Sequence, residues 1–561
     1  MTSAARRSPP GASRVRWFRP AVAVVAWSVA LRAVASATVG LMPEEAYYWN
    51  YGRHLDFGYL DHPPLIGWFI RAAEAVAGPA TRAGAAGADH AAVSRWIVRL
   101  PAMACWAVTA WFAALHARTV LGRRAAWPVA ALVAVLPYFF VSGTVATPDA
   151  PLMASWSAAV YFLGRALVGG RRLAWWGAGV ALGVGMLSKY TAALLIPATA
   201  AAMLTVPAWR VWFRRPEPWA ALLLALAMFS PVIVWNAGNQ WVSFAFQTSG
   251  RRDPAAGFGL HWMPLHVAAL LTPWALVVAA VFVAGRFGGG RFGGIESIRR
   301  VRRSGPIRSG PRRHRAGRIA RGRTLALCLT GVPLATFAVH ALADDPKMHW
   351  SGPAWLAALP YAMVALRAGR RGTPPQGLGS MARWWNRTAV GLVALFTAAV
   401  IYASGGAPRA WYPGFWLMPM PWPDLAAAVE KVVARVTAET GRRPLLVGMD
   451  TNALASALAF HAPRGGGDRT VAGAGLFLRK DLMYSRWHPP RAQASRDLVL
   501  VSWDARTLER WPVPFSAARL HPVETLTINW RGAPFYKVHV RVLHGYRPVA
   551  RRTEAVRNPG E

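Results

Sequence analysis

Acidic side chains gather in one short stretch that directly follows the first long apolar segment of the chain. Residues 43–68 carry Glu44, Glu45, Asp61 and His62 among closely spaced tyrosine and tryptophan residues. Carboxylates are costly close to a membrane core and are kept there when they serve a function, such as accepting a proton in a reaction. A solvated loop with aromatic side chains at the membrane interface would have the same composition. The stretch is therefore either a reactive acidic site or an ordinary loop.

Other polar motifs supply cations that are suited to holding a phosphate. The chain has only five lysines, and two of them, Lys189 and Lys347, lie in unusual polar motifs, the second two residues before His349. A nearby cation stabilises a phosphate as negative charge develops on it. Lys189 is also consistent with an interfacial lysine whose stem lies on apolar surface, and Lys347 and His349 with a solvated loop. Asp149 follows a proline and is either a site carboxylate or a helix cap.

The elements that must position these residues are those of a membrane protein. Of the 561 residues, 54% are hydrophobic and only 16% are charged, which is too few charges for a soluble enzyme of this size. The formal net charge of +40 would ordinarily suggest nucleic acid as a partner. Here, however, arginines fall in blocks between apolar runs, which is the positive-inside pattern, so nucleic acid is an unlikely partner. The two cysteines belong to no metal-ligand spacing.

Apolar runs of about 15 to 22 residues predict about eleven membrane spans. The first apolar run is too long for the core of a cleaved signal peptide, which predicts an uncleaved signal anchor. Arginine blocks occur in every second connection, which predicts a cytoplasmic N-terminus. This alternation requires two short helices to meet near Lys189, which would place that lysine in a recessed site. The predicted spans lie at roughly 21–41, 95–117, 125–143, 150–167, 173–187, 190–207, 219–236, 264–285, 324–343, 350–367 and 388–406.

The predicted fold class is a polytopic α-helical membrane protein with a C-terminal α/β domain outside the membrane. A basic cytoplasmic N-terminus (1–20) precedes a transmembrane domain (21–406), which contains an outside loop (42–94) and a flexible, arginine-rich cytoplasmic loop (286–323) near anionic lipid head groups. Residues 407–561 form the outer domain. Helices are expected at 425–436 and 453–460, and strands at 445–449, 498–501, 525–528 and 538–542.

With this topology, all the unusual polar motifs fall on the outer side. They resemble one family, the bacterial family-39 glycosyltransferases of the GT-C superfamily, which are related to protein mannosyltransferases and aminoarabinose transferases. The resemblance is carried by residues 44–49 (EEAYYW), 58–65 (GYLDHPPL), 147–151 (TPDAP), 187–191 (LSKYT) and 347–354 (KMHWSGPA), and by residues 450–461 and 475–487. The family usually has Asp-Glu where this chain has Glu44-Glu45.

The resemblance implies transfer of a sugar from a polyprenyl phosphate to an envelope lipid, glycan or protein on the outer face of the bacterial cytoplasmic membrane. It implies an inverting displacement with Glu44 as the catalytic base. Some relatives use a divalent metal ion, but no ligand spacing in this chain requires one, so metal dependence stays open. The residues expected to bind substrate are Glu45, Tyr48, Asp61, His62, Asp149, Lys189, Lys347 and His349.

Two other classes of function compete with a transferase. A transporter or flippase for a lipid-linked sugar would also carry charged residues within the membrane. Against this, the polar residues lie at loops on one side instead of near span midpoints, and the two halves of the chain show no symmetry. A binding or sensing protein that uses the outer domain would leave the acidic stretch unexplained. The sequence therefore favours a transferase, but it names neither the sugar nor the acceptor.

Overall fold

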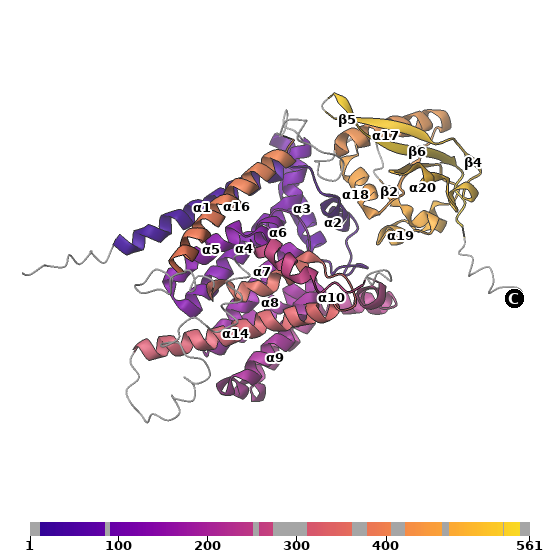
Figure 1. The fold of residues 1–561 in the computed structure, drawn as a ribbon. Coiled ribbons are helices and arrows are strands. Elements are labelled where there is room, and N and C mark those ends of the chain that lie inside the picture. The colour runs from indigo at the N-terminus through magenta and orange to yellow at the C-terminus, as the bar shows by residue number, and fades with distance from the viewer. Residues whose placement is uncertain are drawn as a thin grey trace, which may run out of the picture. The chain divides into compact units, whose positions relative to one another are not determined.

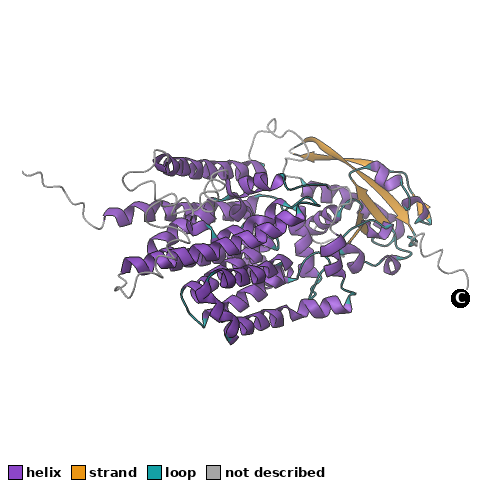
Figure 2. Cartoon of the chain, turned by 60° about the horizontal axis from the view of Figure 1, so that its bottom comes forward, coloured by secondary structure: helices purple, strands orange, loops and turns teal. Residues whose placement is uncertain are grey.

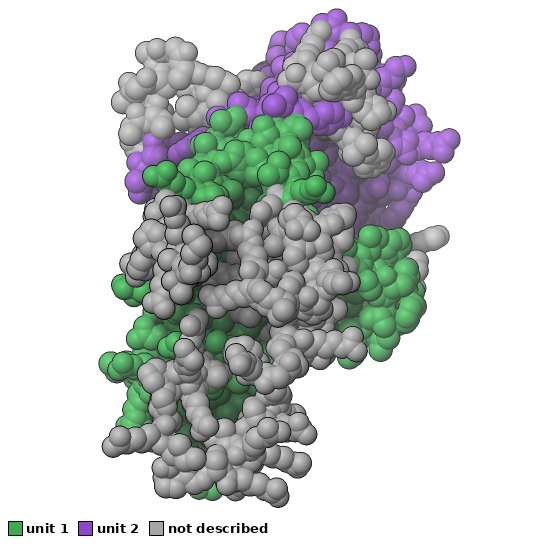
Figure 3. Space-filling view, turned by 60° about the vertical axis from the view of Figure 1, so that its left-hand side comes forward, with its two compact units in different colours: residues 1–36, 62–66, 99–399 green, residues 37–61, 67–98, 400–561 purple. Residues whose placement is uncertain are grey.

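The computed structural model describes residues 12–84, 90–250, 257–272, 311–361, 378–405, 421–462, 470–530 and 532–549. Two compact units divide the chain, and each is assembled from separate stretches (Figure 3). Unit 1 comprises residues 1–36, 62–66 and 99–399, and unit 2 comprises residues 37–61, 67–98 and 400–561. Most of the acidic stretch therefore belongs to the same unit as the C-terminal residues, whereas the predicted boundary at 406–407 had separated them.

Unit 1 is helical in its described residues (Figures 1 and 2). Four described helices are long and apolar enough to cross a membrane, namely Arg19–Thr38, Ser94–Leu121, Pro216–Gly238 and Gly317–His340. The predicted helical membrane fold is confirmed, but the predicted number of spans is not. Several predicted spans are short or broken helices, and parts of those predicted at 264–285 and 350–367 lie outside the described residues. The helices of this part are α1 (Ala12–Thr38), α4 (His90–Leu121), α5 (Ala126–Val135), α6 (Pro137–Ser142), α7 (Asp149–Leu163), α8 (Ala174–Ser188), α9 (Leu195–Thr205), α10 (Pro216–Gly238), α11 (Val242–Ala245), α14 (Pro311–His340) and α16 (Leu378–Ala403).

Helix α8 packs closely against both α7 and α10. A side-chain carbon at Gly179 would lie 2.5 Å from the backbone oxygen of Ala221 on α10, and one at Gly185 would lie 3.0 Å from the hydroxyl of Ser155 on α7. Small residues permit such close approach between membrane helices. Helix α8 then ends at Ser188, and Lys189 is extended before a 3₁₀ turn, η3 (Tyr190–Leu194), leads into α9. The predicted break beside Lys189 is therefore present.

A proline separates helices α5 and α6, and other helices take up the carbonyl groups that it frees. Pro137 has no N–H, so the carbonyl of Val133 has no helical donor. The indole of Trp106 donates to that carbonyl at 3.3 Å, and the hydroxyl of Ser28 donates to the next carbonyl, that of Ala134, at 2.9 Å. The α5–α6 break is thus tied to α4 and α1.

Arg32 provides a second tie between α1 and α6. Its guanidinium is fully buried, donates to the backbone oxygen of Phe139 at 3.1 Å and lies over the rings of Trp106 and Phe140 at 4.1 and 4.5 Å. It also donates to Ser28. A buried charge is tolerated only when its donors are used in this way. Because the N-terminal run looks like a simple anchor, the sequence did not single out this arginine.

We expect Arg32→Met to destabilise the fold, because the variant keeps most of the side-chain volume but leaves backbone carbonyls of α6 without donors. The midpoint of thermal unfolding in detergent should fall by about 5 °C or more. Arg118→Met is the matched control, since Arg118 is exposed on α4. Equal midpoints for the two variants would contradict a structural role of Arg32.

Unit 2 contains a six-stranded mixed sheet with helices packed on it (Figures 1 and 2). The strand order is β2-β1-β3-β6-β4, and β5 also pairs with β6. Strands β1, β2 and β3 are parallel, with Leu446 opposite Val471 and Val499, and β6 runs antiparallel to β3, β4 and β5. The strands are β1 (Leu445–Gly448), β2 (Val471–Gly473), β3 (Leu498–Ser502), β4 (Arg519–Leu520), β5 (Glu524–Trp530) and β6 (Ala533–His544), and the helices are α17 (Trp422–Thr440), α18 (Asn452–His461), α19 (Tyr484–Trp487) and α20 (Ala505–Glu509).

The predicted C-terminal helices and strands are all present, but two stretches predicted as loops differ from the structure. The predicted outside loop 42–94 contains helices α2 (Pro43–Arg53) and α3 (Leu65–Gly84). Most of the arginine-rich loop 286–323 lies outside the described residues, but residues 311–323 begin α14. Arginine and alanine favour a helix, and a proline at its first position does not interrupt it.

Candidate functional site

Helix α2 carries the paired glutamates in its first turn. Pro43 occupies the first helical position, and Met42 is the residue that caps the helix. Glu45 is fully buried, and its Oε2 atom accepts a hydrogen bond from the backbone N–H of Met42 at 3.0 Å. This is one half of a capping box, and the negative charge also lies at the favourable end of the helix dipole.

The two glutamates therefore have different surroundings. Glu44, predicted to be the catalytic base, is exposed. Glu45, predicted to shape a substrate pocket, is turned into the protein and holds the start of α2. A base needs access to its substrate, and a carboxylate already used as a cap is less available for that purpose. The geometry favours Glu44 over Glu45 as the acid–base group.

Asp61, another predicted binding residue, accepts hydrogen bonds from two tyrosines of α2 within unit 2. Its Oδ1 atom accepts hydrogen bonds from the hydroxyls of Tyr47 at 2.9 Å and Tyr51 at 2.6 Å. Burial, reinforced by the charge of Asp61, raises the pKa of both tyrosines well above the ordinary value, so both hydroxyls keep their protons and donate. Because the tyrosines are four residues apart, Asp61 holds one face of α2.

The remaining predicted residues of the acidic stretch are also packed inside the protein. Tyr48 is 8% exposed and meets the rings of Tyr47 and Tyr51 at 5.5 and 5.4 Å. Tyr51 in turn stacks on Tyr59 at 3.6 Å between ring centroids. His62 is 6% exposed and belongs to unit 1. Tyr48 therefore supports the shape of α2, and its predicted contact with substrate stays a prediction.

A second cluster lies in unit 1, where α7 begins and α8 ends. The Nζ atom of Lys189 lies 3.0 and 3.1 Å from the two carboxylate oxygens of Asp149. The hydroxyl of Tyr138 donates to Asp149 at 3.3 Å, and the Nε2 atom of His349 lies 3.9 Å from its Oδ2. The side chains of Asp149 and Lys189 are only 13% and 6% exposed, whereas that of His349 is 46% exposed.

This cluster joins three residues that the sequence predicted separately. Asp149 was predicted to bind substrate or to cap α7, and the structure shows that it neutralises the buried Lys189. A buried ammonium is retained only with such a partner. Lys347 is exposed at the start of the 3₁₀ segment η6 (Met348–Ala357), which also carries His349. Lys347 is therefore an accessible cation, His349 is a partly exposed side chain near Asp149, and Lys189 is a paired cation.

We next consider which side chains could bind a metal ion. Within the described ranges, no group of three or more His, Cys, Asp or Glu side chains comes close enough to bind a metal ion. Asp61 already accepts two tyrosine hydroxyls. In the described part of the chain, the side chains therefore do not form a metal site by themselves.

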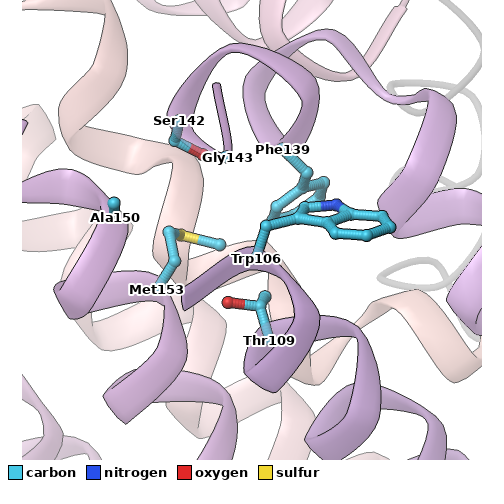
Figure 4. A pocket seen from close by; sticks show the side chains of 7 residues that line it. All are labelled: Trp106, Thr109, Phe139, Ser142, Gly143, Ala150 and Met153. Atoms are coloured by element: carbon cyan, nitrogen blue, oxygen red, sulfur yellow. The ribbon is translucent and has the colours of Figure 1, made fainter. Parts of the chain in front are cut away.

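A small apolar hollow lies beside the start of α7 (Figure 4). It contains no space that a water molecule could fill. It cannot accommodate a sugar, and it reflects the packing of Trp106 against α6 and α7. The side chains around it are Trp106, Thr109, Phe139, Ser142, Gly143, Ala150 and Met153.

Sequence analysis gave no role to Asn50, Glu74 and Tyr484, which hold helix α2 in place. Tyr484 is 1% exposed and bonds to Asn50 of α2, and Glu74 of α3 accepts a hydrogen bond from the indole of Trp49 at 2.6 Å. Residues 475–487 carried a family resemblance but no expected role. A buried tyrosine in a segment with several aromatic neighbours was the available signal, since its hydroxyl needs a partner.

Comparison with known proteins places these clusters in context. Residues 61–235 match the family model described as dolichyl-phosphate-mannose-protein mannosyltransferase. The chain is 27% identical over 202 residues to the lipid A galacturonosyltransferase RgtD of Rhizobium johnstonii (strain DSM 114642 / LMG 32736 / 3841), a match that covers 34% of this chain and 38% of that protein. The chain thus spans under half the length of this curated relative.

Two crystal structures of ArnT from Cupriavidus metallidurans share the fold. The apo structure superposes with a TM-score of 0.59 at 16% identity and covers 94% of this chain and 98% of ArnT. The structure bound to undecaprenyl phosphate gives a TM-score of 0.58, also at 16% identity, and covers 93% of this chain and 98% of ArnT. This chain therefore has the same fold as ArnT. The resemblance to family-39 enzymes that the motifs carried is confirmed, as is the expectation of a multi-pass membrane protein.

Proposed function

We propose that this protein is a membrane glycosyltransferase that moves a sugar from a polyprenyl phosphate to an acceptor of the bacterial envelope. The observation that carries the proposal is the first turn of α2, in which Glu45 caps the helix and Glu44 is exposed. The family match at residues 61–235 and the ArnT-like fold support it. A preorganised, accessible carboxylate is what a proton acceptor in such a transfer requires.

The proposed reaction is a single inverting displacement. An acceptor hydroxyl attacks the anomeric carbon, and its proton passes to the carboxylate of Glu44. The new bond forms between the acceptor oxygen and the anomeric carbon as the bond from that carbon to the phosphate oxygen breaks. The polyprenyl phosphate leaves with the electron pair, and cations stabilise the charge that develops on it. The candidates are His349, Lys347 and Lys189, the last held in place by Asp149.

The substrates are proposed from the relatives. A structure of ArnT contains undecaprenyl phosphate, which supports a polyprenyl-phosphate donor for this chain. RgtD acts on lipid A, which favours a lipid acceptor over a glycan or a protein. The arginine blocks support a cytoplasmic N-terminus and transfer on the outer face of the cytoplasmic membrane.

Mass spectrometry of the envelope tests this proposal. Glycolipids and glycoproteins are compared between cells with the gene, cells without it, and cells that carry the Glu44→Gln variant. We expect one sugar-bearing lipid species to disappear without the gene and to stay absent with Glu44→Gln. Identical lipid and protein profiles in all three strains would contradict the proposed function.

A further inference from the structure

A chain of hydrogen bonds joins the C-terminal α/β fold to the helix that carries Glu44. The Nδ2 atom of Asn50 lies 3.3 Å from the hydroxyl of Tyr484. That hydroxyl lies 2.9 Å from the Oγ atom of Ser456, which donates in turn to the backbone oxygen of Asn452 at 2.6 Å. All of these residues belong to unit 2, so a single compact unit contains both α2 and the helix α18.

The chemistry of the groups fixes the direction of every bond. Ser456 has one hydroxyl proton and uses it on the carbonyl of Asn452, so it must accept from Tyr484. Burial raises the pKa of Tyr484 well above the ordinary value, so the hydroxyl keeps the proton that it donates. The amide nitrogen of Asn50 can only donate, and its bond ends on the oxygen of Tyr484.

The other end of this series of hydrogen bonds lies in the first turn of α2, which carries Glu44 and Glu45. The second proton of the Asn50 amide goes to the backbone oxygen of Ala46 at 2.9 Å. Ala46 directly follows the two glutamates and is 1% exposed. The ring of Tyr484 also packs against Tyr47 and Trp487, with 6.4 and 5.2 Å between ring centroids. Helix α2 is therefore tied to the C-terminal fold through both Asn50 and Tyr47.

We propose that Tyr484 is a positioning residue for sugar transfer, through which the C-terminal α/β fold sets the placement of Glu44. The inference rests on the proposed function and deepens it, because it gives the C-terminal fold a part in turnover. The hydroxyl of Tyr484 touches neither substrate nor Glu44 in this account. It acts by holding the turn of α2, and small displacements of a reacting group lower turnover strongly.

The test is Tyr484→Phe, which removes one oxygen and keeps the aromatic packing. We expect kcat to fall about tenfold while KM for the donor stays within about twofold, because binding groups are untouched. Tyr546→Phe is the matched control. Tyr546 is equally buried in the same fold, and its hydroxyl donates to the backbone oxygen of Leu476 instead of towards α2. This control should keep the parental kcat.

A double variant separates positioning from general weakening of the fold. Asn50→Leu breaks the same chain from the side of α2, so combining it with Tyr484→Phe should lower kcat no further than the more damaging single change. Three results would overturn the inference while leaving the proposed function intact. They are a double variant whose loss of kcat equals the product of the two single losses, a parental kcat for Tyr484→Phe, and an equal loss of kcat in Tyr546→Phe. A parental protein without acceptor-dependent transfer would overturn the proposed function, and this inference with it.

Discussion

Glu44→Gln lowers the turnover number by at least about a hundredfold and leaves thermal stability close to that of the parent. The substitution keeps the volume and most hydrogen bonding of the side chain but removes the proton acceptor, and loss of a general base has an effect of this size. Stability should hardly change because Glu44 is exposed and the cap of α2 depends on Glu45. Initial rates of sugar transfer by purified protein give the measurement.

Glu45→Gln is the matched control for this variant. A glutamine at the same position still reaches the backbone N–H of Met42, so the helix start is preserved. We expect a smaller loss of turnover than for Glu44→Gln. Glu44→Asp restores the family's usual acid but shortens the arm, so partial activity is expected. If Glu44→Gln transferred sugar at the parental rate, Glu44 would not be the base, and Asp61 or Asp149 would be the next candidate.

Lys189→Ala has the second large effect, and it involves both the fold and the donor. The change leaves the carboxylate of Asp149 buried without its ammonium partner, and breaking a buried pair in this way costs about 3 to 5 kcal/mol. If Lys189 also contacts the donor phosphate, KM for the donor rises about ten- to a hundredfold. Thermal unfolding and donor titration measure the two effects separately.

Replacing Asp149 and Lys189 together with neutral residues separates the effect on stability from the effect on donor use. In the variant Asp149→Asn with Lys189→Met, no charge is left unpaired, so stability should largely return, whereas donor use should stay impaired. Lys347→Ala serves as the companion variant, because Lys347 is exposed and its loss should affect donor use without affecting stability. Full recovery of donor use in the double variant would show that Lys189 has only a structural role.

The sequence predicted the local elements well because each has a local cause. The break beside Lys189 follows from polar residues between two short apolar runs, and the structure has it there. Strands such as β3 are short apolar runs bounded by polar residues, and they were predicted to within one residue. The resemblance carried by residues 44–49 and 347–354 also led to the correct fold.

The partners of these residues could not be predicted, because they are distant in sequence. Asp149 and Lys189 are 40 residues apart and Asn50 and Tyr484 are 434 apart. Only the packing of α7 on α8 and the folding of unit 2 bring these pairs together. The sequence treated Lys189 as a lone cation for this reason. It also placed α2 in a loop, since an aromatic and acidic stretch of eleven residues lacks a clear apolar stripe.

Release of polyprenyl phosphate by the purified protein in liposomes distinguishes a glycosyltransferase from a flippase. The liposomes contain lipid-linked sugars extracted from cells that lack the gene, with or without envelope lipids from the same cells as acceptor. A glycosyltransferase with Glu44 as its base releases polyprenyl phosphate only when the acceptor is present, and the Glu44→Gln variant releases at least about a hundredfold less. Movement of the intact lipid-linked sugar across the bilayer, with no polyprenyl phosphate released in either condition, would contradict the account and identify a flippase.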